Sequence, residues 1–556
     1  MTKTTTRSRR DFLRLHPAPA SAPPSATLSG LSPYAGPWTT QEAGHLLSRA
    51  TMGATFAMIR EATRLGMEGA LDKLLADLEL PAPPIADEDD GITPAGESWV
   101  DQAYPAGNAA TQQAQGVRRR SMWAWIFQLR LEEGISARET MALFWHNHFA
   151  INNVNEPRWN YLHSQLLRRQ AFGNFRDFVK EITVDPLMLA FLDGTRNTVR
   201  APNENYAREL MELFTLGKGP QVGPGDYTNY TEEDVLAMAR SLTGWQNQGA
   251  RTRDPEQPIT PRFVPRRHDT GTVQLSHRFD NRELPSSGEQ TYADLVDLIL
   301  EKEAASEFIV RKLYRWFVYY EISEEVEATI IRPLAAQFRE GDYELLPVLR
   351  TLLGSEHFFD VLSQGPMIKH PIRSVVGMLR QLEVRPDNPA RLPYRYYFAI
   401  YNRCNQIGMG DFRPPNVAGW KAFYQEPLYY RQWINSSTLP LRQRISDQLF
   451  ANNVRFQGYG RVAFSLLDQV NEFARPGELW PMIDEWVSLL FPRPIPDAQR
   501  EFIKNILLPG LPDTQWSIEY ADYQANPGDE TLARALETNL RRMVKAMLEM
   551  PEYQLS

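Results

Sequence analysis

The stretch NENYARELMELFTLG, residues 203–217, carries the clearest helix pattern in the chain. Asn203 is a residue type that begins helices well, because its side-chain oxygen accepts a hydrogen bond from a free backbone N–H group. Leu210, Leu213 and Phe214 recur at the spacing of one helix face. Gly217 follows them, and glycine commonly ends a helix. The stretch therefore predicts an amphipathic helix that packs its apolar face on a core.

Helix signals of this kind recur along most of the chain. Residues 39–42 and 136–139 match the capping box, in which two side chains satisfy backbone N–H groups at a helix start. Residues 246–288 break the pattern, and the alternation at 272–275 predicts a small hairpin there. We predict an all-α, mainly helical protein: one large multi-helix scaffold with long irregular loops and at most one small β-hairpin.

Composition narrows the class of protein further. The 556 residues are 42% hydrophobic, which is enough apolar surface for a large core. The net charge is −8, so no basic surface for nucleic acid is expected. Cys404 is the one cysteine, which excludes an intramolecular disulfide and a zinc site with two thiolates. We see no apolar run of the length that spans a membrane, and we expect no transmembrane segment.

The N-terminal residues contain a possible export signal. Residues 8–13, SRRDFL, match the twin-arginine pattern, but the following residues 15–24 include four prolines where an apolar stretch is needed. A working or relict signal would place the protein in the periplasm, whereas a basic tail would leave it in the cytoplasm. We expect a disordered leader at 1–36, a helical core at 37–445 and a C-terminal helical extension at 446–556 that packs on the core.

Several longer blocks resemble one family. They are HLLSRA (45–50), FWHNHF (144–149), the stretch at 203–217, YTEEDV (230–235), LTGW (242–245), PPNVAGW (414–420) and WINSSTL (433–439). Together they resemble the bacterial domain-of-unknown-function 1800 family over about residues 40–445. The resemblance implies no established reaction. Members of that family often carry twin-arginine signals, and the resemblance implies a possible partner from a neighbouring phosphatase-like family.

Two histidines in the FWHNHF block are candidate metal ligands. His146 and His148 lie two residues apart, so on a regular helix they point to opposite sides. They converge on one ion only if the helix ends or unwinds near Asn147. The alternative is that His148 is a hydrogen-bonded core histidine, since it shares a face with apolar residues.

The stretch at 203–217 holds the other candidate ligands. Glu209 and Glu212 are three residues apart, a spacing that lets two carboxylates share a cation on a bundle helix. Arg208 could hold an anionic substrate or orient a carboxylate. Asn203 and Asn205 at the helix start are candidate substrate contacts. The structural alternative is a ladder of ion pairs on a solvated face.

Two loops complete the predicted site. His268 and Asp269 sit in the long irregular segment, where an aspartate can orient an imidazole, although a hydrogen-bonded turn explains them equally well. The later loop offers a polar and aromatic set that suits a sugar-like or planar ligand, with aromatic packing on the core as the alternative. That set is Asn416, Trp420, Trp433 and Asn435.

These residues lead to a first hypothesis of a metal-assisted enzyme, hydrolytic or oxidative, with its site between helices. The predicted catalytic residues are Arg208, Glu209, Glu212, His268 and Asp269, and the predicted metal ligands are His146, His148, Glu209 and Glu212. Imidazole and carboxylate ligands suit a divalent transition metal, Zn, Fe or Mn. The alternatives are a non-catalytic binding or assembly protein that acts with an exported partner or glycan, and a haem protein.

Overall fold

The computed structural model describes residues 30–249, 252–254, 257–386, 394–451, 455–456 and 460–556. Helices make up 58% of the chain and strands 6%, which confirms the mainly helical fold. None of the described helices is both long enough and apolar enough to cross a bilayer. The SRRDFL stretch lies outside the described residues.

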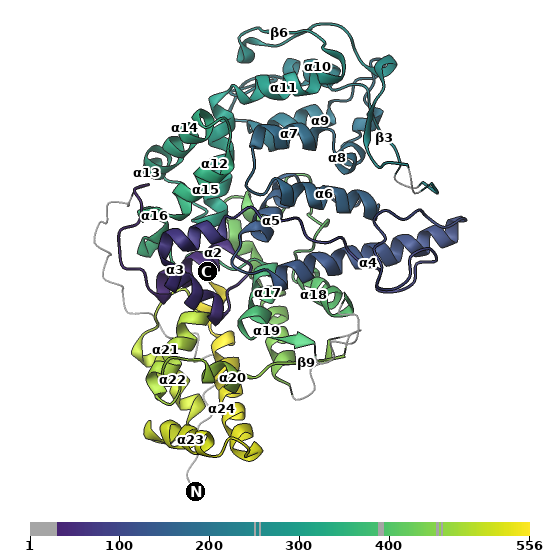
Figure 1. Ribbon diagram of the computed structural model, residues 1–556. Helices are drawn as coiled ribbons and strands as arrows, with labels where there is room; N and C mark the ends of the chain where they lie inside the picture. Colours follow the sequence, from purple (N-terminus) through teal and green to yellow (C-terminus); the bar gives the residue numbers. More distant parts are fainter. Residues whose placement is uncertain (1–29, 250–251, 255–256, 387–393, 452–454, 457–459) are drawn as a thin grey trace.

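The helices of the first half are coloured from purple to blue-green in Figure 1. They are α2 (Thr40–Ala50), α3 (Phe56–Leu74), α4 (Asn108–Glu132), α5 (Arg138–His148), α6 (Pro157–Arg169), α7 (Phe175–Thr183), α8 (Pro186–Phe191), η1 (Gly194–Arg196), α9 (Glu204–Glu209), η2 (Leu210–Thr215) and α10 (Glu232–Ser241).

The second half begins with short turns of helix and continues with longer helices. They are η3 (Pro265–Arg267), η4 (His277–Phe279), η5 (Gly288–Gln290), α11 (Thr291–Leu300), α12 (Glu303–Phe317), α13 (Glu324–Val326), η6 (Glu327–Ile331), α14 (Arg332–Glu340), α15 (Leu345–Leu353), α16 (Glu356–Phe359), η7 (Val361–Ser363), α17 (Pro371–Gln381), α18 (Tyr394–Gln406), η8 (Lys421–Phe423), η9 (Tyr429–Trp433), α19 (Thr438–Phe450), α20 (Leu466–Asn471), α21 (Leu479–Leu490), α22 (Asp497–Leu507), α23 (Thr514–Ala525), α24 (Glu530–Glu549) and η10 (Pro551–Gln554).

The strands form four small sheets, so the prediction of at most one hairpin is wrong. The sheets pair β1 (Gln221–Gly223) with β2 (Asp226–Tyr227), β3 (Trp245–Asn247) with β4 (Pro261–Phe263), β5 (Val273–Gln274) with β6 (Glu283–Leu284), and β7 (Arg385–Pro386) with β9 (Gly460–Ala463), which also pairs with β8 (Arg455–Phe456). The β5–β6 pair lies where the hairpin was predicted. The other strands are too short to show an alternating pattern in the sequence.

Helix α4 crosses the middle of the molecule, where it packs against α17 and α18 (Figure 1). Helices α7 to α11 lie on one side of this centre, and α20 to α24 form the opposite end. One hydrophobic cluster runs through both parts, from Ala43 to Tyr553. The C-terminal helices join it through α21, which packs against α2. Phe56 of α3 also contacts Trp486 of α21.

The helix predicted at 203–217 has two parts. Asn203 caps it as expected, its side chain accepting from the N–H group of Asn205, and Gly217 ends it with φ +72°. Between them α9 gives way to the π-helical segment η2, whose wider hydrogen-bonding pattern spacing alone does not reveal. The capping box at 39–42 is confirmed. The one at 136–139 is wrong, because Glu139 instead pairs with Arg168.

Buried arginines bind the carbonyl groups at the ends of distant helices. The guanidinium of Arg380 on α17 donates to Gly53 O at 2.6 Å, Arg130 O at 2.8 Å and Glu133 O at 2.6 Å. Arg49 on α2 likewise donates to Phe317 O at 2.9 Å and to Val318 O. The last carbonyl groups of a helix have no partner within the helix, so these arginines satisfy them from outside.

We therefore predict that Arg380→Leu is strongly destabilising. The change removes the donor from two carbonyl groups at the end of α4 and from Gly53 O in the linker between α2 and α3. We expect the free energy of unfolding to fall by about 3 kcal/mol or more. Urea unfolding followed by circular dichroism measures it. Arg385→Leu is the control, because that side chain is 78% exposed. We expect it to change stability by less than about 0.5 kcal/mol, and equal effects of the two substitutions would contradict this role.

Candidate functional site

The two histidines of the FWHNHF block point to different neighbours. Helix α5 stays helical through His148, so it does not unwind at Asn147. His146 faces residues 412–420, where its Nε2 accepts a hydrogen bond from the N–H group of Phe412 at 2.8 Å. Its ring packs against Trp420 with 5.7 Å between ring centroids. Burial lowers the pKa of His146 to about 3, so the imidazole is neutral.

His148 faces the end of η2 instead, the second part of the helix at 203–217. Its Nε2 lies 3.0 Å from Phe214 O, and its Nδ1 lies 3.0 Å from Nζ of Lys312. Lys312 also donates to Leu213 O at 2.9 Å. Both ring nitrogens of His148 are therefore engaged, and the pair satisfies carbonyl groups at the end of η2. Burial lowers the pKa of Lys312 to about 7 and that of His148 well below its usual value.

In the helix formed by α9 and η2, Arg208 makes ion pairs with nearby glutamates. Arg208 binds Glu232 at 2.8 Å and Glu204 at 3.0 Å, and hydrogen bonding to Glu232 raises its pKa. Glu212 accepts from the hydroxyl of Tyr230 at 2.8 Å. Burial, and then the charge of Glu212, raise the pKa of Glu209 to about 6. Arg208 thus links the stretch at 203–217 to the YTEEDV block. Asn205 is exposed on this helix.

The side chains of His268 and Asp269 are held by hydrogen bonds to neighbouring residues of the protein. His268 is buried, with Nδ1 2.9 Å from Thr243 O and Nε2 2.9 Å from the hydroxyl of Ser286. Asp269 binds Arg240 at 2.7 Å, and this hydrogen bond lowers its pKa. The loop is thereby joined to the LTGW block through Thr243.

The predicted polar and aromatic set contributes two asparagines that stabilise turns and two buried tryptophans. Asn416 accepts from the N–H group of Ala418 at 3.0 Å, and Asn435 accepts from that of Ser437 at 2.9 Å, so each amide shapes its own turn. Trp420 and Trp433 are buried. The backbone N–H of Trp420 donates to Asn147 Oδ1 at 2.9 Å, which attaches the PPNVAGW block to the end of α5.

The four predicted metal ligands do not form one site. His146 and His148 point to different regions, and Glu209 and Glu212 lie on the helix formed by α9 and η2. Within the part of the chain that the structure describes, no three His, Cys, Asp or Glu side chains are grouped closely enough to hold a metal ion. The predicted blocks are brought together in pairs, but through contacts that hold the scaffold.

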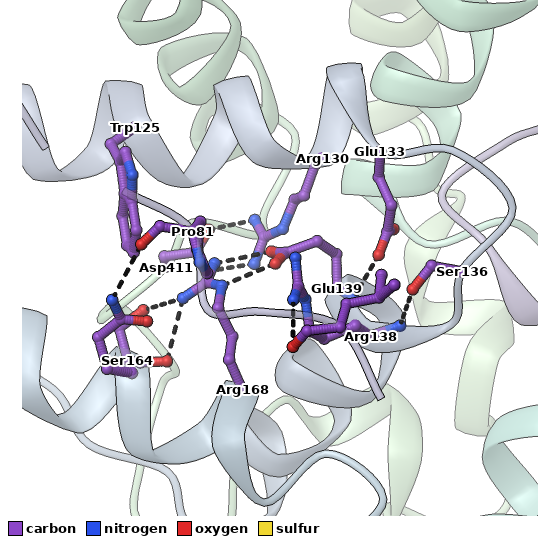
Figure 2. Close-up of polar contacts among 12 residues, drawn as sticks. Pro81, Trp125, Arg130, Glu133, Ser136, Arg138, Glu139, Ser164, Arg168 and Asp411 are labelled. Carbon is purple, nitrogen blue, oxygen red and sulfur yellow. Dashed lines mark hydrogen bonds and ion pairs between the residues drawn. The ribbon is translucent and has the colours of Figure 1, made fainter. Parts of the chain in front are cut away.

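Two buried arginine–carboxylate pairs explain part of this arrangement. Figure 2 shows these pairs. Arg130 donates two hydrogen bonds of 2.6 Å to Asp411, and Arg168 donates two of 2.7 Å to Glu139. These pairs tie α4 to residue 411 and α5 to α6. An arginine that makes two hydrogen bonds to a carboxylate leaves it little freedom to bind another cation, so Asp411 and Glu139 hold the scaffold together.

A cavity of about 350 Å³ lies elsewhere, between α2, α17, the end of α21 and the segment 491–500. We call it the α2–α17 cavity. Pockets for small molecules fall in the range of about 300–1,000 Å³. Much of its wall is apolar, from residues that include Ala54, Ile59, Val487, Leu490, Phe491 and Ile495. The chain segment at 555–556 also lines it.

Basic side chains line the same cavity. Lys369 donates to Tyr553 O at 2.7 Å, and Arg373 donates to Arg49 O at 2.7 Å. Burial lowers the pKa of Lys369 to about 7 and that of Arg373 to about 10. Among the described residues, neither makes an ion pair with a side-chain carboxylate. Arg500 also lines the cavity, but it is paired with Asp484 at 2.8 Å.

A family model described as a protein of unknown function, DUF1800, matches residues 45–555. The chain belongs to the DUF1800 family. This match extends about a hundred residues beyond the blocks recognised in the sequence, so the C-terminal helices are part of it. No curated protein and no solved structure matches the chain. In this DUF1800 protein the recognised blocks meet one another, whereas the α2–α17 cavity draws on the HLLSRA block and on segments outside the blocks.

Sequence reasoning missed Lys369 and Arg373, although a signal was present. His370 caps α17, so the two cations flank the start of that helix, and its first turn contains no acidic residue. The start of a helix carries partial positive charge, which makes cations unfavourable there. Residues that break such a local rule are expected mainly at functional or strained sites.

The burial of neutral His146 predicts a loss of stability in acid. Its pKa is about 3 in the folded protein against an ordinary value of 6.5. The unfolded chain therefore binds the proton first, and this contribution is complete above the ordinary pKa and is lost as pH falls below it. We expect His146→Gln to reduce the stability loss between about pH 7.5 and about pH 5 by about 2 kcal/mol. Urea unfolding at both pH values measures this, and parallel losses in the two proteins would refute it.

Proposed function

We propose that this protein binds a small organic anion in the α2–α17 cavity. The observation that carries the proposal is that Lys369 and Arg373 line the cavity and, among the described residues, make no ion pair with a carboxylate. The aspartates of the wall, Asp484 and Asp497, are both paired with Arg500. Buried charges in proteins are normally paired or neutralised. A bound anion would supply the missing charge.

The two cations in the cavity wall do not reflect an excess of positive charge over the whole chain. With a net charge of −8, the protein has no general surplus of cations. Lys369 nevertheless lies close enough to Arg373 and Arg442 that their charges lower its pKa further, after burial. An anion beside Lys369 would reverse that shift, because an opposite charge favours the protonated amine.

The position of the two residues supports the same ligand class. Both flank the N-terminus of α17, an 11-residue helix whose partial positive charge attracts anions. The apolar part of the wall, formed by side chains such as Val487, Leu490 and Phe491, suits an alkyl or similar tail. The preferred ligand is therefore a carboxylate with an apolar tail.

The metal-assisted enzyme and the haem protein remain predictions of the sequence. The proposal made here is nearer to the alternative of a binding protein, with a small anion in place of a protein partner or glycan. It does not use the predicted residues Glu209, Glu212, His268 or Asp269, because these groups are engaged in the scaffold or lie on the helix formed by α9 and η2.

Octanoate is a suitable probe, with 1-octanol as the uncharged comparison. We expect calorimetric titration to detect octanoate binding to the wild-type protein and much weaker binding of 1-octanol. Arg373→Gln removes the cation but keeps a polar side chain, and we expect it to weaken octanoate binding by about tenfold, or about 1.4 kcal/mol.

The control is Lys421→Gln, which removes an exposed cation outside the cavity wall. It should bind octanoate like the wild type. Each variant is first compared with the wild type by circular dichroism and by its unfolding midpoint. The proposal fails if folded wild-type protein does not bind octanoate, or if folded Arg373→Gln binds it as tightly as the control.

A further inference from the structure

We infer that Lys369 is a nucleophile that forms an imine with the carbonyl carbon of an oxo acid held in the α2–α17 cavity. The inference rests on the proposed function, since the carboxylate of the oxo acid would be the anion bound there. It adds a covalent step and narrows the ligand to a carbonyl compound with an acidic group and an apolar tail.

The surroundings of the amine support this role. Lys369 lines the cavity, and its Nζ lies 3.9 Å above the centre of the Tyr553 ring while donating to Tyr553 O. These contacts fix the amine without a carboxylate that would hold it as an ammonium ion. Arg373, four residues further along the chain and in the first turn of α17, lines the same cavity, where it can receive the ligand's carboxylate.

The protonation state of the amine is consistent with nucleophilic attack. Burial, followed by the charges of Arg373 and Arg442, lowers the pKa of Lys369 to about 7. A substantial fraction of the amine is therefore neutral near neutral pH, whereas an exposed lysine is almost fully protonated there. Lowering of this kind, by an apolar site or a neighbouring cation, is how lysine becomes a nucleophile in Schiff-base enzymes.

The chemistry needs no further reactant. The nitrogen lone pair of Lys369 attacks the carbonyl carbon, a C–N bond forms, and the carbonyl oxygen leaves as water with the two hydrogens of the neutral amine. The product is a C=N bond between Nζ and the ligand, and water can reverse the reaction. No electron transfer takes place.

Lys312 provides an internal comparison. Its pKa is also lowered to about 7 by burial, but its Nζ is held between His148 and Leu213 O and packs on the ring of Phe308. It does not line the α2–α17 cavity. A lowered pKa by itself would make both lysines reactive, whereas placement in the cavity singles out Lys369.

The test is reductive trapping on the full-length protein. We incubate it with 2-oxooctanoate and cyanoborohydride near neutral pH and map the reduced adduct by peptide mass spectrometry. We expect Lys369 to be modified at least about tenfold faster than Lys312 or exposed Lys421, because Lys369 combines a lowered pKa with a place in the cavity wall, whereas neither of the other two lines the cavity. An excess of octanoate should suppress modification of Lys369 alone.

The controls separate this inference from the proposed function. Lys369→Arg cannot form an imine, so this variant should lose the adduct, while octanoate binding is measured on the wild-type protein. If that variant does not fold, protection of wild-type Lys369 by octanoate still tests the assignment. Octanoate binding without an adduct on Lys369, or an adduct spread equally over all lysines, overturns the imine alone. Absence of octanoate binding overturns the proposed function, and the imine with it.

Discussion

The structure depends on buried cations that satisfy the carbonyl groups at helix ends. Arg380 donates to the end of α4 and to the linker between α2 and α3, Arg49 donates to the end of α12, and Lys312 and His148 contact carbonyl groups at the end of η2. A helix end buried in a large core has no water to bind its last carbonyl groups, so another element must supply donors. A protein with this many packed helices needs such donors throughout its interior.

This requirement explains why the blocks shared with the DUF1800 family are mostly scaffold. His148 joins the FWHNHF block to the stretch at 203–217, Asn147 joins it to PPNVAGW, and Thr243 joins LTGW to His268. Each link is a hydrogen bond between side chain and backbone over a long sequence distance. Polar residues with these roles resemble catalytic residues in a sequence, because both are buried, polar and set among apolar neighbours.

The α2–α17 cavity differs from these places in one respect. Lys369 and Arg373 also donate to carbonyl groups, but they lie beside an open volume and, among the described residues, make no ion pair with a carboxylate. Elsewhere in the described interior, Arg130 and Arg168 are neutralised by carboxylates, as Figure 2 shows. The electrostatic contrast between these two arrangements, rather than the presence of charge alone, distinguishes a candidate binding site from a structural ion pair.

The sequence by itself determined the helical class, the caps at Thr39 and Asn203, and the end of a helix at Gly217, because these depend on contacts within a few residues. It also supported the argument that His146 and His148 face apart, which follows from helix geometry. Only the tertiary structure decided which carbonyl each buried cation meets, where Glu139 pairs, and that Lys369 and Arg373 line a cavity. Those outcomes depend on residues that lie far apart along the chain, by 29 positions for Glu139 with Arg168 and by 327 for Gly53 with Arg380, and no local spacing encodes their approach.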